Sequence, residues 1–79
     1  MNELFCLYWY DETQQSHCEK YLKPLDECKP AFDRLTTGPA ARMGFVTRIK
    51  VTDSLDCLVL DLSRHEGRWV DTQHLPTQP

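Results

Sequence analysis

The sequence predicts one α+β domain over residues 1–79, in which an N-terminal strand joins a C-terminal antiparallel β-meander and one or two short helices pack on one face. Three observations predict this fold class. Aromatic and aliphatic residues crowd segment 3–10, an apolar stripe at helical spacing runs through 24–35, and apolar and polar residues alternate over much of 43–62. A chain of 79 residues has room for a single hydrophobic core, which excludes two-domain enzymes.

The first expected strand is residues 3–10, Glu-Leu-Phe-Cys-Leu-Tyr-Trp-Tyr. Four of the eight aromatic residues of the chain lie there, and aromatic residues favour strands. One face would carry Cys6, Tyr8 and Tyr10, and the other Leu7 and Trp9. Because both faces are largely apolar, we expect a strand that is central in the sheet or covered on both sides.

Two helical segments are expected next. Over residues 11–23, Asp11 is a suitable N-cap, and Ser16 with Glu19 has the spacing of a capping box. Over 24–35, two prolines six residues apart argue against one long helix and predict two short helical turns, each with proline at its first position. The apolar stripe that we expect to pack on the sheet consists of Leu25, Cys28, Phe32 and Leu35. Residues 36–39, Thr-Thr-Gly-Pro, should then break the helix.

The segments 43–52 and 55–62 are expected to form an antiparallel pair of strands. In the first strand, Ile49 and Val51 share a face with Phe45 and Thr47, and the opposite face carries Val46, Arg48 and Lys50. A two-residue loop at Asp53-Ser54 pairs Ile49 with Leu58 and Phe45 with Leu62, which gathers the large apolar residues on one face, and a four-residue loop keeps the same facing. An odd loop would turn Asp61 to the inside, so we expect the even loop.

The last expected strand is 68–72, after a turn that ends at Gly67. A three-residue loop would place Trp69 on the outer face beside Val59 and Arg48, and a four-residue loop would place it inside. The sequence leaves both alternatives open. The tail 75–79 is expected to fray.

Residues 67–76, Gly-Arg-Trp-Val-Asp-Thr-Gln-His-Leu-Pro, resemble the closing segment of SH3-like barrels, in which a glycine and an aromatic or aliphatic pair lead through a short turn into a last strand. Asp71 stands where SH3 domains usually carry a proline, and the acidic RT-type loop is not recognisable. The resemblance covers about ten residues and implies an alternative fold, a small SH3-like β-barrel with a helical insertion, without implying a function.

Composition and motifs give no catalytic or metal site. The four cysteines lack the paired C-x₂-C spacing of structural zinc sites, and the chain carries no nucleophile-elbow, P-loop or zinc-protease motif. We therefore expect no metal, no cofactor and no enzymatic activity. The first residues lack a basic signal-peptide region, and no apolar stretch is long enough to span a bilayer, so we expect a reduced, cytoplasmic protein without membrane contact.

The expected function is that of a small non-enzymatic protein that acts through protein–protein interaction, with a homo-oligomer favoured. The candidate surface combines strand residues with the last turn: Arg48, Lys50, Val59, Arg64, Arg68 and Trp69. The same basic and aromatic residues support the alternative of a nucleic-acid-binding domain, which the formal net charge of −3 disfavours. On an ordinary solvated face, Arg48 and Lys50 would instead pair with Asp61 or Asp56. A third alternative is a small-molecule-binding protein with an aromatic-lined pocket.

Overall fold

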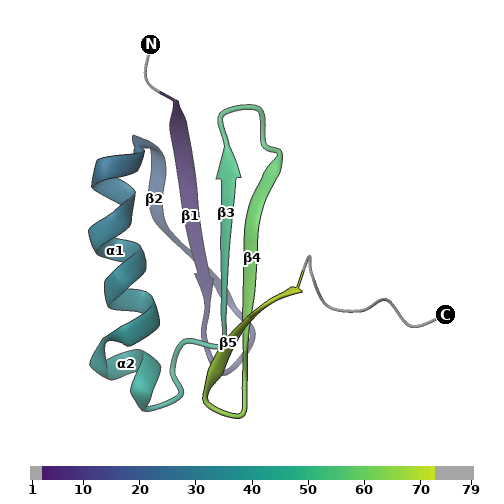
Figure 1. Cartoon of the computed structure of the whole chain (residues 1–79). Helices are drawn as coiled ribbons and strands as arrows, with labels where there is room; N and C mark the ends of the chain where they lie inside the picture. Colours follow the sequence, from purple (N-terminus) through teal and green to yellow (C-terminus); the bar gives the residue numbers. More distant parts are fainter. Residues whose placement is uncertain (1–2, 73–79) are drawn as a thin grey trace, which may run out of the picture.

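The computed structural model, which describes residues 3–72, contains one antiparallel sheet with a helix packed on one face (Figure 1). The elements in chain order are β1 (Leu4–Tyr10), β2 (Ser16–Pro24), α1 (Leu25–Thr37), α2 (Pro39–Arg42), β3 (Arg48–Asp53), β4 (Leu58–His65) and β5 (Arg68–Asp71). The strand order is β2-β1-β3-β4-β5. This confirms the α+β class and the central position of the N-terminal strand. The sheet is open, with β2 and β5 at its edges, so the chain does not form the alternative SH3-like barrel.

The helix expected over residues 11–23 is wrong, because Ser16–Pro24 is a strand that pairs with β1. The Asp11 carboxylate caps no helix and instead closes the β1–β2 loop, where its Oδ1 accepts hydrogen bonds from the backbone N–H of Thr13 at 2.8 Å and of Gln15 at 3.0 Å. An aspartate side-chain oxygen accepts hydrogen bonds from backbone N–H groups both at helix N-termini and in tight turns. As a helix, this segment would bury only a narrow apolar stripe. As a strand, it pairs with β1.

One bent helix replaces the two short turns expected over 24–35. Pro24 precedes α1 as its N-cap residue, and Pro30 lies inside the helix. Proline removes one backbone donor and bends a helix without ending it when tertiary packing holds both sides. That packing comes from the buried side chains Cys28, Ala31 and Leu35, two of which belong to the expected stripe. The expected break is confirmed, since α1 ends at Thr37, and the short α2 follows it.

The paired residues of β3 and β4 face the side of the sheet that we expected, but the register of the pair differs from the expected one. Ile49 lies opposite Leu62 instead of Leu58, because the turn contains residues 54–57 and a β-bulge shifts the register between β3 and β4. The shift is an even number of residues, so Ile49 and Leu62 still share a face, as expected. The strand begins only at Arg48. Phe45 and Val46 therefore lie in a loop, where Val46 is buried and Phe45 is exposed, the reverse of the expected pattern.

The core lies between α1 and the sheet. Five buried residues form it, namely Leu7, Ala31, Leu35, Val46 and Ile49, and it is surrounded by the partly buried Trp9, Phe32, Val51 and Trp69. We call the side of the sheet under α1 the helix face and the opposite side the open face. Register places Leu7, Trp9, Ile49, Val51, Leu60 and Leu62 on the helix face, and Cys6, Tyr8, Tyr10, Arg48, Lys50, Thr52 and Asp61 on the open face.

Candidate functional site

Trp69 belongs to the helix face. The β4–β5 turn has two residues, Glu66 and Gly67, both with positive φ, which is the geometry of a tight hairpin turn. A loop of this even length turns Trp69 toward α1, where it packs on the core and its Nε1–H donates a hydrogen bond to the Thr36 carbonyl at 2.9 Å. The three-residue loop considered from the sequence is therefore wrong. The hydrogen bond of Trp69 connects β5 to the C-terminal end of α1.

The six candidate residues do not form one surface. Arg48 and Lys50 lie on the open face, as expected from their alternation, whereas Arg64 lies opposite Trp69 on the helix face, with its guanidinium 5.5 Å from the ring centre. Arg68 is exposed next to the β4–β5 turn, and Val59 lines a groove on the helix side. The basic and aromatic strip expected from the sequence is thus divided between two sides of the sheet.

Arg48 is engaged within the protein. Its Nε donates to Oδ1 of Asp61 at 2.8 Å, and its Nη2 donates to Oδ2. Asp61 is only 4% exposed, and the hydrogen bonds from the guanidinium keep the pKa of its carboxyl below the ordinary value despite burial. The same guanidinium lies 5.3 Å from the centre of the Tyr10 ring. Its charge is therefore largely compensated, which lowers its value as a phosphate ligand.

An apolar groove separates α1 from β4. Figure 1 shows α1 beside β2 and β1, with β3 and β4 further from the helix. The groove has a volume of about 420 Å³ and is lined by Phe5, Leu7, Leu25, Cys28, Lys29, Phe32, Val51, Val59 and Leu60. We call it the helix-face groove. Its lining combines side chains from α1 with side chains from β1, β3 and β4, and Lys29 contributes its aliphatic stem.

Apolar side chains also stand exposed around the helix-face groove. Leu25 at the start of α1 is 55% exposed, and Val59 in β4 is 47% exposed. The bulge between β3 and β4 lies at Val59, between the paired Leu58 and Leu60, and both Val59 and Leu60 line the groove. Exposed apolar side chains gathered at an apolar groove are typical of sites that contact another molecule.

A smaller polar hollow lies on the open face. Its volume is about 260 Å³, and its lining residues are Tyr8, Tyr10, Ser16, Lys50, Thr52 and Asp56. We call it the open-face hollow. A hydrogen bond with Cys6, together with burial, raises the pKa of the Tyr8 phenol to about 12. At neutral pH this phenol therefore keeps its proton.

The cysteines and histidines form no metal site in residues 3–72, where no three potential ligands come together. All four cysteines are free; Cys6 and Cys28 are buried, and burial raises the pKa of the Cys28 thiol. Cys57, which lies in the strand expected over 55–62, is instead exposed in the β3–β4 turn. His74 and the tail 75–79, which we expected to fray, lie outside the described residues.

Sequence reasoning placed Tyr8 and Tyr10 on one face, and Lys50 on one face with Arg48, but it did not find the helix-face groove. The groove depends on where α1 crosses the sheet, and a local pattern does not contain that position. Neither helix in the described range 3–72 has the length and apolar character needed to cross a bilayer. Comparison with protein-family models, curated proteins and solved structures finds no match to this chain.

Proposed function

We propose that this is a non-enzymatic interaction protein that pairs with a second copy of itself through the helix-face groove. The observation that carries the proposal is the combination of an open, apolar-lined groove with exposed apolar side chains on both of its sides. In a two-fold symmetric pair, the same patch serves both copies, so a patch must offer projections as well as a hollow. Leu25 and Val59 are the projections, and the groove between them is the hollow.

The size of the core supports a second copy as the occupant. Within residues 3–72, only five residues make up the buried core cluster. Domains of this size bury a smaller fraction of their surface than larger domains do, and association with another subunit is a common source of additional stability. Covering Leu25 and Val59 would add apolar burial beside the helix-face groove.

The two alternatives have less support. A nucleic-acid-binding face needs several uncompensated cations near aromatic rings, whereas Arg48 is paired with Asp61 and Trp69 packs against α1. A small apolar ligand would fit the helix-face groove by volume, since ligand pockets commonly measure about 300–1,000 Å³. A monomer with such a molecule bound would be the outcome that favours this third function.

Sedimentation equilibrium of the wild type and two aspartate variants tests the proposal. Val59→Asp places a carboxylate at the groove, and Met43→Asp, at another exposed apolar position, is the matched control. We expect a wild-type dimer, an unchanged Met43→Asp dimer, and a dissociation constant for Val59→Asp that is about a hundredfold higher, because the carboxylate loses its hydration on burial. A wild type that stays monomeric at high concentration contradicts the proposal.

A further inference from the structure

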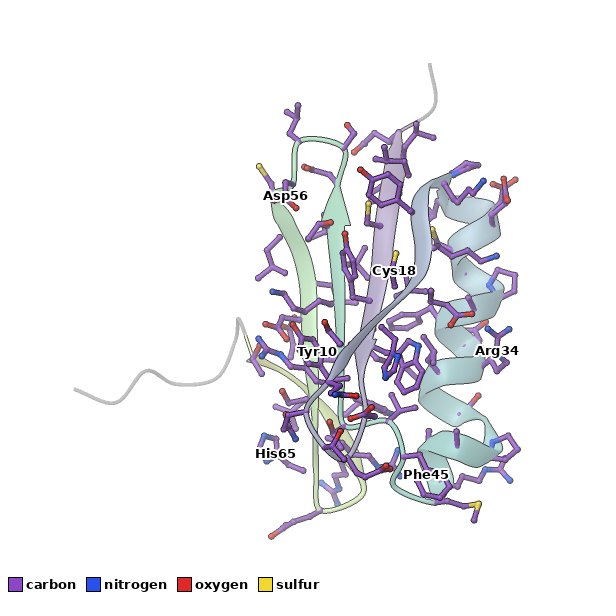
Figure 2. All side chains as sticks on the ribbon, turned by 180° about the vertical axis from the view of Figure 1, so that it is seen from behind. Tyr10, Cys18, Arg34, Phe45, Asp56 and His65 are labelled. Carbon is purple, nitrogen blue, oxygen red and sulfur yellow. The ribbon has the colours of Figure 1, made fainter. Side chains whose placement is uncertain are left out.

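The open-face hollow is independent of the helix-face groove, because the two lie on opposite sides of the sheet. The central strands β1 and β3 supply Tyr8, Tyr10, Lys50 and Thr52, and the β3–β4 turn supplies Asp56. Figure 2, which views the molecule from behind, shows Asp56 at the end of the sheet near the β3–β4 turn and Tyr10 further along the strands. The hollow therefore runs along the two central strands.

Thr52 gives this hollow an unsatisfied polar group. The residue is 7% exposed, and its Oγ1 has no hydrogen-bond partner within the described part of the chain. Buried hydroxyl groups are almost always paired, because an unpaired one loses its bonds to water without replacement. A ligand atom in the hollow that exchanges a hydrogen bond with Thr52 would remove this deficit.

Two opposite charges line the same hollow without neutralising each other. Residues 3–72 contain three ion pairs, His17–Asp11, Arg34–Glu19 and Arg48–Asp61, and neither Lys50 nor Asp56 takes part in them. An anionic ligand alone would meet the carboxylate of Asp56, and a cationic ligand alone would meet the ammonium of Lys50. A ligand that carries both charges would satisfy both residues.

We propose that the open-face hollow binds a small zwitterion of the amino-acid class, with its carboxylate on Lys50 and its ammonium group on Asp56. The rings of Tyr8 and Tyr10 then border the ligand side chain, and the hydroxyl of Thr52 bonds to one of the polar groups. The volume of about 260 Å³ lies just below the range of about 300–1,000 Å³ for larger ligands, which suits a molecule of this size.

Titration of the full chain with L-phenylalanine and L-leucine, followed by backbone amide chemical shifts, tests the proposal. We expect saturable shifts around the hollow and an affinity that falls about tenfold in Lys50→Met and in Asp56→Asn, because each variant removes one charge-assisted contact. Lys23→Met and Asp33→Asn remove the same charges at exposed positions away from the hollow, and they should bind as the wild type does.

Two ligand controls test the need for both charges. N-acetyl-L-phenylalanine lacks the ammonium group and L-phenylalaninamide lacks the carboxylate, so each should bind about tenfold more weakly than the free amino acid. Equal binding of the acetylated compound would reveal a simple anion site and overturn the proposal. The absence of saturable shifts with both free amino acids would overturn it as well.

Thr52→Val separates a ligand site from a structural role. Valine keeps the shape of threonine and removes the unpaired hydroxyl, so the unliganded variant should unfold at the same or a higher urea concentration than the wild type. The same variant should bind L-phenylalanine more weakly. A loss of stability without a loss of affinity would show that Thr52 serves the fold alone, and it would contradict the proposed contact. Because Val59 lies outside this hollow, failure of the proposed dimer would leave these results unchanged.

Discussion

Replacing Arg48 with methionine tests whether the Arg48–Asp61 pair is a structural element of the open face. The substitution keeps an unbranched side chain of similar length and removes the two hydrogen bonds to the Asp61 carboxylate. The side chain of Asp61 is 6% exposed and that of Arg48 is 39% exposed. The variant therefore leaves a buried carboxylate without the cation that stabilises it.

The expected loss in free energy of unfolding follows from this burial. Removing one partner of a fully buried pair costs about 3–5 kcal/mol, but solvent screens the partly exposed Arg48, so we expect a loss of about 2 kcal/mol at pH 7. Domains of this size have a total stability of about 4–12 kcal/mol. A loss of this size should lower the melting temperature by about 8–16 °C.

The stabilisation that the Arg48–Asp61 pair contributes should depend on pH. Arg48 lowers the folded-state pKa of Asp61, so the pair contributes its full stabilisation above the unfolded pKa of about 3.9 and loses it as the pH falls toward the folded value. Urea denaturation at pH 7 and at about pH 2.5 should therefore show a smaller difference between Arg48→Met and the wild type at the lower pH.

Arg34→Met is the matched control, because Arg34 pairs with Glu19 through side chains that are 59% and 27% exposed. We expect this control to cost less than about 1 kcal/mol. The reasoning is refuted if Arg48→Met costs no more than Arg34→Met, or if its cost is equal at the two pH values.

Three further substitutions test the elements that position both sites, each by urea denaturation. Pro30→Ala restores a backbone donor at an exposed position inside α1 and should stabilise the fold by about 1–3 kcal/mol; a loss would show that the bend is needed. Glu66→Asn suits the left-handed conformation of the β4–β5 turn and should add about 0.5 kcal/mol, whereas no gain would argue against the turn geometry. Trp69→Phe keeps an aromatic ring but removes the hydrogen bond to Thr36, so we expect a loss of about 1 kcal/mol, and an unchanged stability would contradict that contact.

Period-two patterns predicted which residues of β1 and β3 share a face, because burial on one side of the sheet restricts which residues face α1, but they did not predict β2. The alternation around Ile49 placed Arg48 and Lys50 on the open face, and the same reasoning placed Tyr8 and Tyr10 together. The exact register was not predictable in this way. A bulge and a longer turn moved the partner of Ile49 by four residues from Leu58 to Leu62 without changing the face that it occupies.

The errors occur where one local signal serves two structures. Asp11 stabilises the β1–β2 loop with the same oxygen that would cap a helix, and the segment after it pairs with β1 as a strand. Pro30 marked a helix boundary by propensity, but the packing of Ala31 and Leu35 on the sheet carries α1 past it. Tertiary contacts decide such cases, and a single sequence does not display them.

The candidate sites, like the fold, were only partly predictable from the sequence. Sequence reasoning identified Lys50 and Val59 as surface residues of interest but assigned them to one surface. The structure places Lys50 in the open-face hollow and Val59 in the helix-face groove. The role proposed for Thr52 and Asp56 depends on the position of the β3–β4 turn at the open-face hollow, which a local sequence pattern does not give. The groove likewise requires the crossing of α1 over the sheet.

The central claim is that two copies meet at the helix-face groove, and isotope-filtered nuclear Overhauser measurements test it most directly. In a mixture of ¹³C-labelled and unlabelled protein, methyl groups of Leu25, Val59 and Leu60 should show intermolecular contacts to protons of the second copy. The Ile49 methyl groups, buried in the core, should show intramolecular contacts alone. Intermolecular contacts that avoid the groove, or no such contacts at millimolar concentration, would contradict the account.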